Sequence, residues 1–471
     1  MPVADIPIHL GMVKAVDEVG LRTHNQAMID VYVDERGSVN RRPGLTSFVN
    51  LTTSAAVDGL FWWGSQSMAI AISNGNTYKI TADDGTFSEI SGDNFEVGAR
   101  VKFADWGTHL YAANGGKILQ IATGAVAELA DGDAPTTVTH PAVLDKYLIG
   151  NEVGSGNFHW SDVNAPTTWT ANLAEAEGRP DNLVAMDSRN LELYLLGKKT
   201  LEVWYDDGSS PFIRMLQGFV ERGTIAEYSF AWCPELSAFV WMDQNRQVVT
   251  MEGRTAVPLS ASMTKYIHGF TAVSDAIGDY FEISGRPYYI LAFPTEDKTL
   301  VLDFRSKQWY EWCYWNSGGA EYQRFRGNCY CLAQDWNFSL VGDRANGLVY
   351  KMDATDYTDN TDTLRSLVRT GHINHGSTIW KRSKHLRFRI KRTEVAPDAA
   401  ALTMLLRYRD NGETSWSNQK TITISALSGE TDYQATIRQL GRYRSRQWEF
   451  VLTDDAALAI VQVQEEFDYL A

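Results

Sequence analysis

Short runs that alternate hydrophobic and polar residues recur along the chain, and tight polar turns join them in pairs. The turns are Asn74-Gly75, Asn114-Gly115, Gly154–Gly156, Gly197-Lys198, Asp243–Asn245, Glu296-Asp297 and Asn346-Gly347. Asn-Gly between alternating runs is a strong hairpin signal, because a type I′ turn needs positive φ at both central residues. The turns recur about every 40 to 50 residues, which is the length of one four-stranded propeller blade.

This periodicity predicts an all-β fold built around a β-propeller that spans residues 51–360. Candidate blades begin near Val57, Ala99, Pro141, Leu183, Ala226, Ile277 and Tyr322. The repeat lies in the spacing of the turns and has no W-D or kelch signature, so the number of blades can be six or seven. We assign residues 1–50 to an N-terminal arm with a closing strand. The alternating segment Met28–Val33 is expected to pair into the last blade, because this pairing removes an open sheet edge.

The pattern stays β-like from Leu364 onward and predicts a separate β-sandwich over residues 363–471. Charge supports this division. Residues 363–471 contain 16 Lys and Arg against 12 Asp and Glu, a balance of +4, which leaves 27 against 46, or −19, for the rest. Two parts of opposite sign suggest two domains with different neighbours. The net charge of −15 argues against a general nucleic-acid binder, which needs basic surface to neutralise phosphates.

The most basic segment, residues 381–392, belongs to the second domain and alternates in the manner of a strand. One face would carry Arg387, Arg389 and Lys391, and the other Leu386, Phe388 and Ile390. A basic face of this kind is either solvated or docked against acidic groups. We expect its cations to lie within salt-bridge reach of acidic groups on another chain, where they would help to set the register between subunits.

No set of residues matches a known catalytic or metal-binding mechanism, so we predict no enzyme activity, no cofactor and no metal. The segment 353–362 carries four Asp but lacks the Gly and Glu of a calcium loop, which favours a linker or blade-end loop. His372 and His375 would need further metal ligands that the sequence does not indicate. The four cysteines are expected to be reduced core thiols. We expect neither a secretory signal nor a membrane span.

The segment Asp410–Trp416 resembles the Asp-box of sialidase propellers, S-x-D-x-G-x-T-W. Tyr408 stands where Ser or Thr is expected, and Ser415 separates Thr414 from Trp416. The segment also occurs only once and outside the predicted blades, which favours a plain hairpin turn. The resemblance keeps a sialidase-like propeller that binds or hydrolyses glycans as an alternative function, and a cellular propeller scaffold is a further one.

Two further segments resemble a phage family. Val31–Val33 followed by Asn40–Leu45 is similar to the N-terminal pattern of packaged-DNA stabilisation, or tail hub, proteins of short-tailed phages, with Asp30 replacing their usual Asn. In the turn Arg42-Pro43-Gly44, Pro fixes φ and Gly permits a left-handed residue. Near the C-terminus, Gln439–Arg446 resembles the G-R-x-R strand that ends many such hubs, and Arg442 and Arg444 join the candidate interface.

The resemblance implies a propeller with a C-terminal β-domain that forms a ring, by resemblance a hexamer, below the portal. Such hubs plug the exit channel for packaged double-stranded DNA, contact portal and adaptor proteins, and carry tail fibres or a needle. We therefore expect a structural protein of the virion tail, assembled in the host cytoplasm, with no catalytic residues and no membrane partner. DNA is expected to pass through the channel without specific binding, because an acidic lining repels phosphates.

Overall fold

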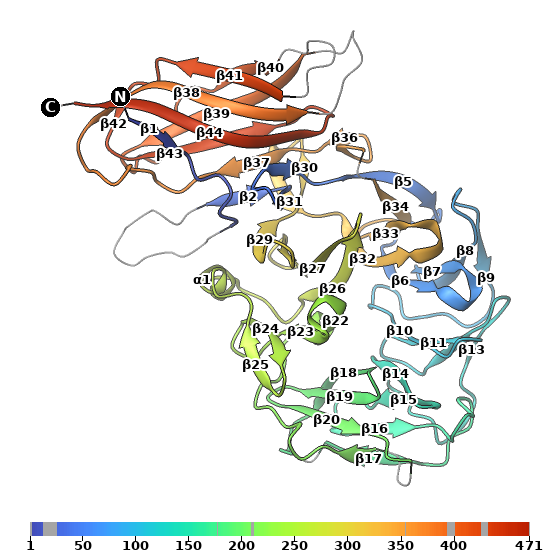
Figure 1. The fold of residues 1–471 in the computed structure, drawn as a ribbon. Helices are drawn as coiled ribbons and strands as arrows, with labels where there is room; N and C mark the ends of the chain where they lie inside the picture. Colours follow the sequence, from blue (N-terminus) through green and yellow to red (C-terminus); the bar gives the residue numbers. More distant parts are fainter. Residues whose placement is uncertain are drawn as a thin grey trace.

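The computed structural model describes residues 2–12, 26–176, 178–208, 212–353, 355–392, 401–424 and 432–470, and all that follows concerns these residues. Figure 1 shows a ring of small sheets with a second sheet domain attached on one side. Within the described residues α1 (Thr264–His268) is the only α-helix. Four 3-10 turns accompany it: η2 (Gly64–Gln66), η3 (Glu227–Ser229), η4 (Pro234–Leu236) and η5 (Gln334–Trp336). The predicted all-β fold, a propeller with a C-terminal sandwich, is confirmed.

Six blades are antiparallel and run in chain order from the first strand to the fourth. Blade one consists of β6 (Val57–Trp63), β7 (Met68–Ser73), β8 (Asn76–Ile80) and β9 (Phe87–Ile90). Blade two consists of β10 (Lys102–Asp105), β11 (Leu110–Ala113), β12 (Leu119–Ile121) and β13 (Val126–Glu128). Blade three consists of β14 (Pro141–Leu144), β15 (Tyr147–Asn151), β16 (Asn157–Trp160) and β17 (Leu173–Glu175). Blade four consists of β18 (Leu183–Arg189), β19 (Glu192–Gly197), β20 (Leu201–Tyr205) and β21 (Ile213–Arg214). Blade five consists of β22 (Ala231–Cys233), β23 (Ala238–Met242), β24 (Val248–Glu252) and β25 (Thr255–Pro258). Blade six consists of β26 (Ile277–Ile283), β27 (Arg286–Phe293), β28 (Lys298–Asp303) and β29 (Gln308–Glu311).

The seventh blade combines the two ends of the propeller sequence. It consists of β32 (Gly327–Ala333), β33 (Phe338–Asp343) and β34 (Leu348–Asp353), with β5 (Gly44–Asn50) paired antiparallel to β34 as the fourth strand. Its first strand, β32, contacts β6 of blade one, so the ring is closed at seven blades. The expected closing strand was therefore wrong: Gly44–Asn50 closes the propeller, and Met28–Val33 does not.

The segment Met28–Val33 instead divides at Asp30, whose φ of 55° interrupts the extended backbone. On one side of this residue, β2 (Ala27–Ile29) lies between β29 of blade six and β37 (Ser366–Arg369). On the other side, β3 (Val31–Val33) pairs with β4 (Val39–Arg41). A left-handed residue redirects the chain, and Asp and Asn tolerate this conformation better than most residues do.

The hairpin turns agree with the sequence pattern throughout the ring. All seven polar turns singled out above lie between the second and third strands of a blade. Asn74 and Gly75 have φ values of 52° and 79°, as a type I′ turn requires. The other two Asn-Gly pairs differ from this expectation, because Asn114, Asn346 and Gly347 do not have positive φ. The predicted starts at Val57, Pro141, Leu183 and Ile277 coincide with the first residue of a blade, and the other three precede it by three to five residues.

The C-terminal residues form a sandwich of two sheets. The first sheet contains β4, β44 (Leu458–Tyr469), β38 (Lys381–Arg392) and β41 (Asp432–Arg438), with β1 (Val3–Asp5) beside β44 and β42 (Arg442–Tyr443) beside β38. The second contains β37, β43 (Arg446–Leu452), β39 (Leu402–Asp410) and β40 (Lys420–Ile424). Phe388 and Phe450 meet edge to face in the core between them, with ring centroids 5.4 Å apart. In Figure 1 both termini lie on this domain, at its end away from the propeller.

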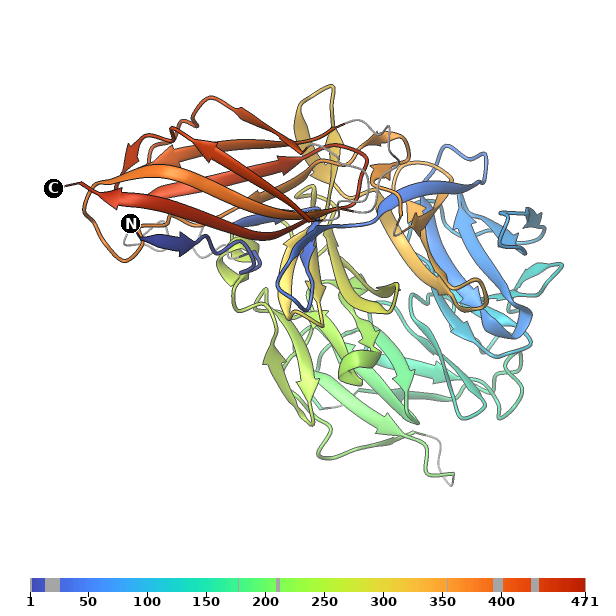
Figure 2. The same ribbon diagram turned by 45° about the horizontal axis from the view of Figure 1, so that its top comes forward.

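The sandwich is not structurally separate from the propeller, contrary to our expectation. Through β2, the second sheet continues into blade six as one nine-stranded sheet. One hydrophobic core also joins residues of both units, including Phe281 and Trp312 on one side and Phe388 and Trp448 on the other. Figure 2 shows the sandwich extending along the side of blades six and seven. No helix among the described residues is long and apolar enough to cross a membrane.

Candidate functional site

The basic segment forms β38, a central strand of the first sandwich sheet, and it alternates as the sequence predicts. Arg387, Arg389 and Lys391 are exposed on the outer face, while Leu386, Phe388 and Ile390 are buried in the core. The neighbours of β38 are β44 and β41, and both contribute carboxylates to the same face. The outer face of this sheet is therefore a mixed field of charges rather than a purely basic surface.

The ion pairs of this face form within the chain. Arg387 contacts Glu466 at 2.7 Å, and Arg389 donates two hydrogen bonds to Asp432 Oδ2, at 2.9 Å from Nε and 2.6 Å from Nη2. These bonds lower the pKa of Asp432. The acidic groups predicted within reach of both arginines thus lie on the same chain, because antiparallel pairing places Glu466 and Asp432 beside them. Docking of this face against another chain stays a prediction. Exposed pairs of this type contribute about 0–1 kcal/mol to stability.

Arg442 and Arg444 lie at the other end of the sheet. Strand β42 pairs with β38 at Lys381 and Arg382, five residues before Arg387, which corresponds to roughly 16 Å along an extended strand. Both arginines are exposed, and the Arg444 guanidinium lies 4.9 Å from the centre of the Trp380 ring. The five candidate interface residues therefore form two groups and not one cluster.

Lys391 differs from the two arginines on its strand, because it also lines a groove at the junction with the propeller. Two adjoining pockets of about 300 and 270 Å³ lie there and share Tyr32, Asp34 and Arg36. The Arg286 guanidinium stacks 4.7 Å from the Tyr32 ring and so fixes the wall between the two pockets. The junction groove therefore receives charged side chains from both units.

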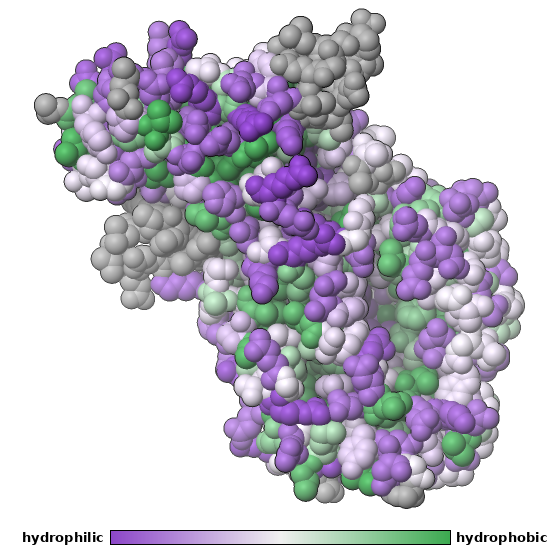
Figure 3. Space-filling view, in the orientation of Figure 1, coloured by the Kyte–Doolittle hydropathy of each residue, from purple (hydrophilic) through white to green (hydrophobic). Residues whose placement is uncertain are grey.

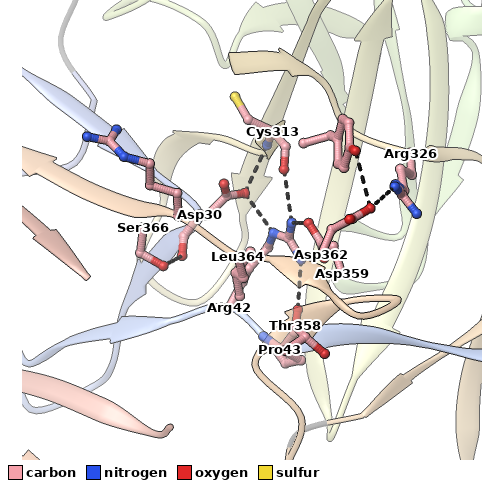
Figure 4. A network of polar contacts seen from close by, with 12 residues as sticks. Asp30, Arg42, Pro43, Cys313, Arg326, Thr358, Asp359, Asp362, Leu364 and Ser366 are labelled. Atoms are coloured by element: carbon pink, nitrogen blue, oxygen red, sulfur yellow. Dashed lines mark hydrogen bonds and ion pairs between the residues drawn. The ribbon is translucent and has the colours of Figure 1, made fainter. Parts of the chain in front are cut away.

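A buried charge network holds this junction together, and Arg42 is its centre (Figure 4). The Arg42 Nε donates to Asp30 Oδ1 at 2.7 Å, and its two Nη atoms donate to Asp359 at 3.0 and 2.6 Å. The remaining donors reach the carbonyl oxygens of Pro43 at 2.9 Å and Cys313 at 3.0 Å. One fully buried guanidinium supplies all these donors. Its planar fork fixes the positions of both carboxylates and compensates their charge.

The network contains two buried carboxylates for one guanidinium. Burial raises the pKa of Asp30 to about 7, although Arg42 favours its ionised form, and the nearby Asp359 raises it further. The opposite charges of both carboxylates raise the pKa of Arg42 above its ordinary value. Arg42 is therefore the permanent cation of the junction, and Asp30 is the group that takes up a proton at lower pH.

Sequence reasoning missed two parts of this network. Asp359, one of the four Asp considered for calcium, belongs to β35 (Thr358–Asp359), which pairs in parallel with β5 at Leu45. Gly44 is not left-handed, contrary to our expectation. A Cβ at Gly44 would collide with the backbone carbonyl of Thr358, so glycine is needed there for close approach. The Arg-Pro-Gly motif was the available signal, but it did not reveal the partner across the fold.

The centre of the propeller contains a small polar cavity of about 160 Å³, where β10, β14 and β18 meet. Arg189 lies 3.6 Å from Asp187 in its lining, and burial lowers the pKa of His140, which stacks on Tyr228, and the pKa of Lys102. Small-molecule sites typically measure about 300–1,000 Å³. The volume of this cavity is below that range.

The remaining candidates for chemistry occupy structural positions. The segment resembling an Asp-box is the connection between β39 and β40, and the Asp410 carboxylate there binds the buried Arg446 at 2.6 and 2.8 Å. His375 contacts Glu465 at 3.1 Å. The free cysteines are Cys233, Cys313, Cys329 and Cys331, and burial raises the pKa of each thiol. In the described parts of the chain, no three His, Cys, Asp or Glu side chains gather as metal ligands would.

Comparison with known structures finds similar chains at low sequence identity. The U3-55K structure shares 12% identity with a TM-score of 0.41, over 66% of this chain and 99% of that one. Dihydro-heme d1 dehydrogenase NirN, in complex with DHE, shares 13% with a TM-score of 0.40, over 85% and 80%. The extracellular domain of the putative one component system BT4673 from B. thetaiotaomicron shares 8% with a TM-score of 0.43, over 87% and 60%. No curated protein matches the sequence.

One family model does match, and it covers most of the propeller. Residues 19–357 fit the phage stabilisation family that is described as bacteriophage P22 Gp10, beta-propeller. The matched region includes Asp30, Arg42 and the closing strand β5, and it ends beside Asp359. The chain therefore belongs to this family of phage stabilisation β-propeller proteins.

Proposed function

We propose that this protein is a structural tail hub of a short-tailed phage, which seals packaged DNA below the portal. The observation that carries the proposal is the family match over residues 19–357. The junction supports it, because a shared core, a continuous sheet and the Arg42 network make the propeller and the sandwich one mechanical unit. A plug that resists the pressure of packaged DNA needs such a connection between its parts.

In this proposal several copies form a ring, a hexamer by family resemblance, around a channel continuous with the portal. Portal or adaptor proteins lie above the ring, and tail fibres or a needle attach to it, so the protein resides in the virion tail after assembly in the host cytoplasm. The net charge of −15 suits a channel through which double-stranded DNA slides without sticking. Closed rings are the usual product of repeated heterologous contacts when the rotation permits closure.

The proposal assigns no catalytic role to the chain. A glycan hydrolase of the common type needs two carboxylates on either side of a bound sugar, and the cavity of about 160 Å³ at the propeller centre is small for such a ligand. We expect no release of reducing sugar from polysaccharides of the host surface. Turnover that disappears when a single Asp or Glu is replaced would support the glycan-hydrolase alternative instead.

The decisive experiment removes this protein from the particle. Heads are expected to fill with DNA and then lose it, and tails are expected to be absent in electron micrographs. Complementation with the full chain should restore both DNA retention and tails. Full retention of DNA together with normal tails in its absence would contradict the hub function.

The outer sheet face is tested by replacing Arg387, Arg389 and Lys391 together with Ser. The monomer is expected to fold normally, because these side chains are exposed and their pairs contribute about 0–1 kcal/mol each. If the face docks against another subunit, incorporation into particles should fall, and most strongly at low salt, where the charges of the original chain are least screened. Unchanged assembly at low and high salt would identify the face as solvated.

A further inference from the structure

The end of the sandwich farthest from the propeller carries a compact basic and aromatic surface, which we call the basic tip. It consists of Ile379, Trp380, Arg382, Arg442, Arg444 and Tyr469. Its three apolar or aromatic side chains are largely exposed: Ile379 by 54%, Trp380 by 41% and Tyr469 by 46%. On the face seen in Figure 3, hydrophilic residues alternate with smaller hydrophobic areas across the sandwich. Large exposed aromatic side chains beside arginines are the composition of interface hot spots.

The charges of the basic tip do not serve the stability of the isolated chain. Arg382 and Arg442 face each other in register on neighbouring strands, an arrangement that destabilises a sheet. Asp468 stands opposite Arg382 on β44, but its carboxylate pairs with Lys384 at 2.6 Å. Within the described residues, none of the three tip arginines forms an ion pair. The tip thus presents three arginines whose charges no ion pair among the described residues neutralises.

The opposite end of the molecule carries the complementary charge. Between Thr81 and Asp181, which covers most of blades one to three, 15 Asp and Glu face only five Lys and Arg, a balance of −10. We call the exposed carboxylates of this region the acidic rim. They include Asp83, Asp84, Glu89, Glu96, Asp133 and Glu175. Glu89 and Glu175 lie on the outermost strands β9 and β17, at the circumference of the ring of blades.

We propose that the basic tip of one copy docks on the acidic rim of a second copy. The two surfaces lie at opposite ends of the molecule in Figure 1, the tip beside β42 and the rim along β9, β13 and β17. Such a contact is heterologous, because each copy uses a different surface, and it repeats to give a closed ring or a filament. The role of this contact in a ring rests on the proposed hub function, whereas the contact itself can be measured with the purified chain.

A second copy fits the tip better than DNA does. Three arginines neutralise few phosphates, and the net charge of −15 repels a polyanion from the rest of the molecule. Ile379, Trp380 and Tyr469 also offer apolar area that a protein partner can bury at the centre of an interface, with the charges around it. The charges then select the acidic rim and orient the tip upon it.

The test measures self-association of the full chain by sedimentation velocity over a range of concentrations. We expect association at about 0.1 M NaCl that weakens at about 1 M, where the Debye length falls from about 10 to about 3 Å. The tip variant Arg442→Glu/Arg444→Glu and the rim variant Glu89→Lys/Glu175→Lys should each associate at least about tenfold more weakly, because like charges now oppose each other. An equimolar mixture of the two variants should associate again, since each supplies the surface that the other lacks.

A matched control places the same charge change elsewhere. Lys265→Glu/Lys307→Glu alters two exposed lysines, one on α1 and one in the β28–β29 turn, and should associate like the original chain. A chain that stays monomeric at all concentrations and both salt levels overturns the proposal. So does association that the tip variant leaves unchanged. Binding of a short DNA duplex that the tip variant abolishes, without an effect on self-association, would assign the tip to DNA instead. The particle-deletion experiment remains a separate test of the hub function.

Discussion

The Arg42 network gives the sharpest prediction about what holds the molecule together. Arg42→Met keeps an unbranched side chain of similar reach but removes all five hydrogen bonds of the guanidinium. The carboxylates of Asp30 and Asp359 then remain buried without a cation. Breaking a buried charge pair by removing one partner typically costs about 3–5 kcal/mol. We expect a loss in this range, limited by the ability of Asp30 to bind a proton.

The assay is equilibrium unfolding in urea, followed by tryptophan fluorescence and by far-ultraviolet circular dichroism. The two probes should give coincident transitions, because the network joins the closing blade to the sandwich and both should unfold together. Arg387→Met is the control, since it breaks an exposed pair with Glu466 in the same chain. It should cost about 0–1 kcal/mol.

Two results would refute this reasoning. The first is an Arg42→Met variant that loses no more stability than Arg387→Met. The second concerns the triple variant Arg42→Met/Asp30→Asn/Asp359→Asn, which no longer buries unpaired carboxylates. It should recover part of the lost stability, because the penalty arises from uncompensated charge. A triple variant less stable than Arg42→Met alone would show that packing, and not charge, dominates the junction.

Three further predictions follow from single positions. Burial raises the pKa of Asp30 from 3.8 to about 7, so the folded chain binds this proton more tightly than the unfolded chain does. The contribution of Asp30 to the free energy of unfolding should therefore fall as pH rises from about 4 to about 7. Asp30→Asn should flatten this pH dependence in urea titrations at several pH values, and an unaltered slope would contradict the assignment. Gly44→Ala should destabilise the chain by about 2 kcal/mol or more because its Cβ meets a rigid carbonyl, whereas Gly116→Ala, with open space around it, should change stability by no more than about 0.5 kcal/mol in the same assay. The buried thiols of Cys233 and Cys313 should react with a thiol reagent only in denaturant, and rapid labelling of the native chain would disprove their burial.

The sequence by itself determined the local architecture. A hairpin turn such as Asn74-Gly75 depends on a few neighbouring residues, so polar turn residues between alternating runs placed the hairpins of all seven blades. The alternation along β38 likewise assigned Phe388 to the core and Arg387 to the surface, because side chains of a strand point to opposite faces in turn. The family resemblance, carried by the motif around Arg42, also came from the sequence.

Only the tertiary structure decided which distant segments meet. The closing strand is Gly44–Asn50 and not Met28–Val33, because the left-handed Asp30 turns the earlier segment toward the sandwich. Arg42 and Asp359 are 317 residues apart, and no local pattern connects them. The pairing of Arg387 with Glu466 depends on the register between β38 and β44 in the same way. Periodicity reports the environment of each residue along its own strand, whereas strand pairing and charge partners are set by how the whole chain packs.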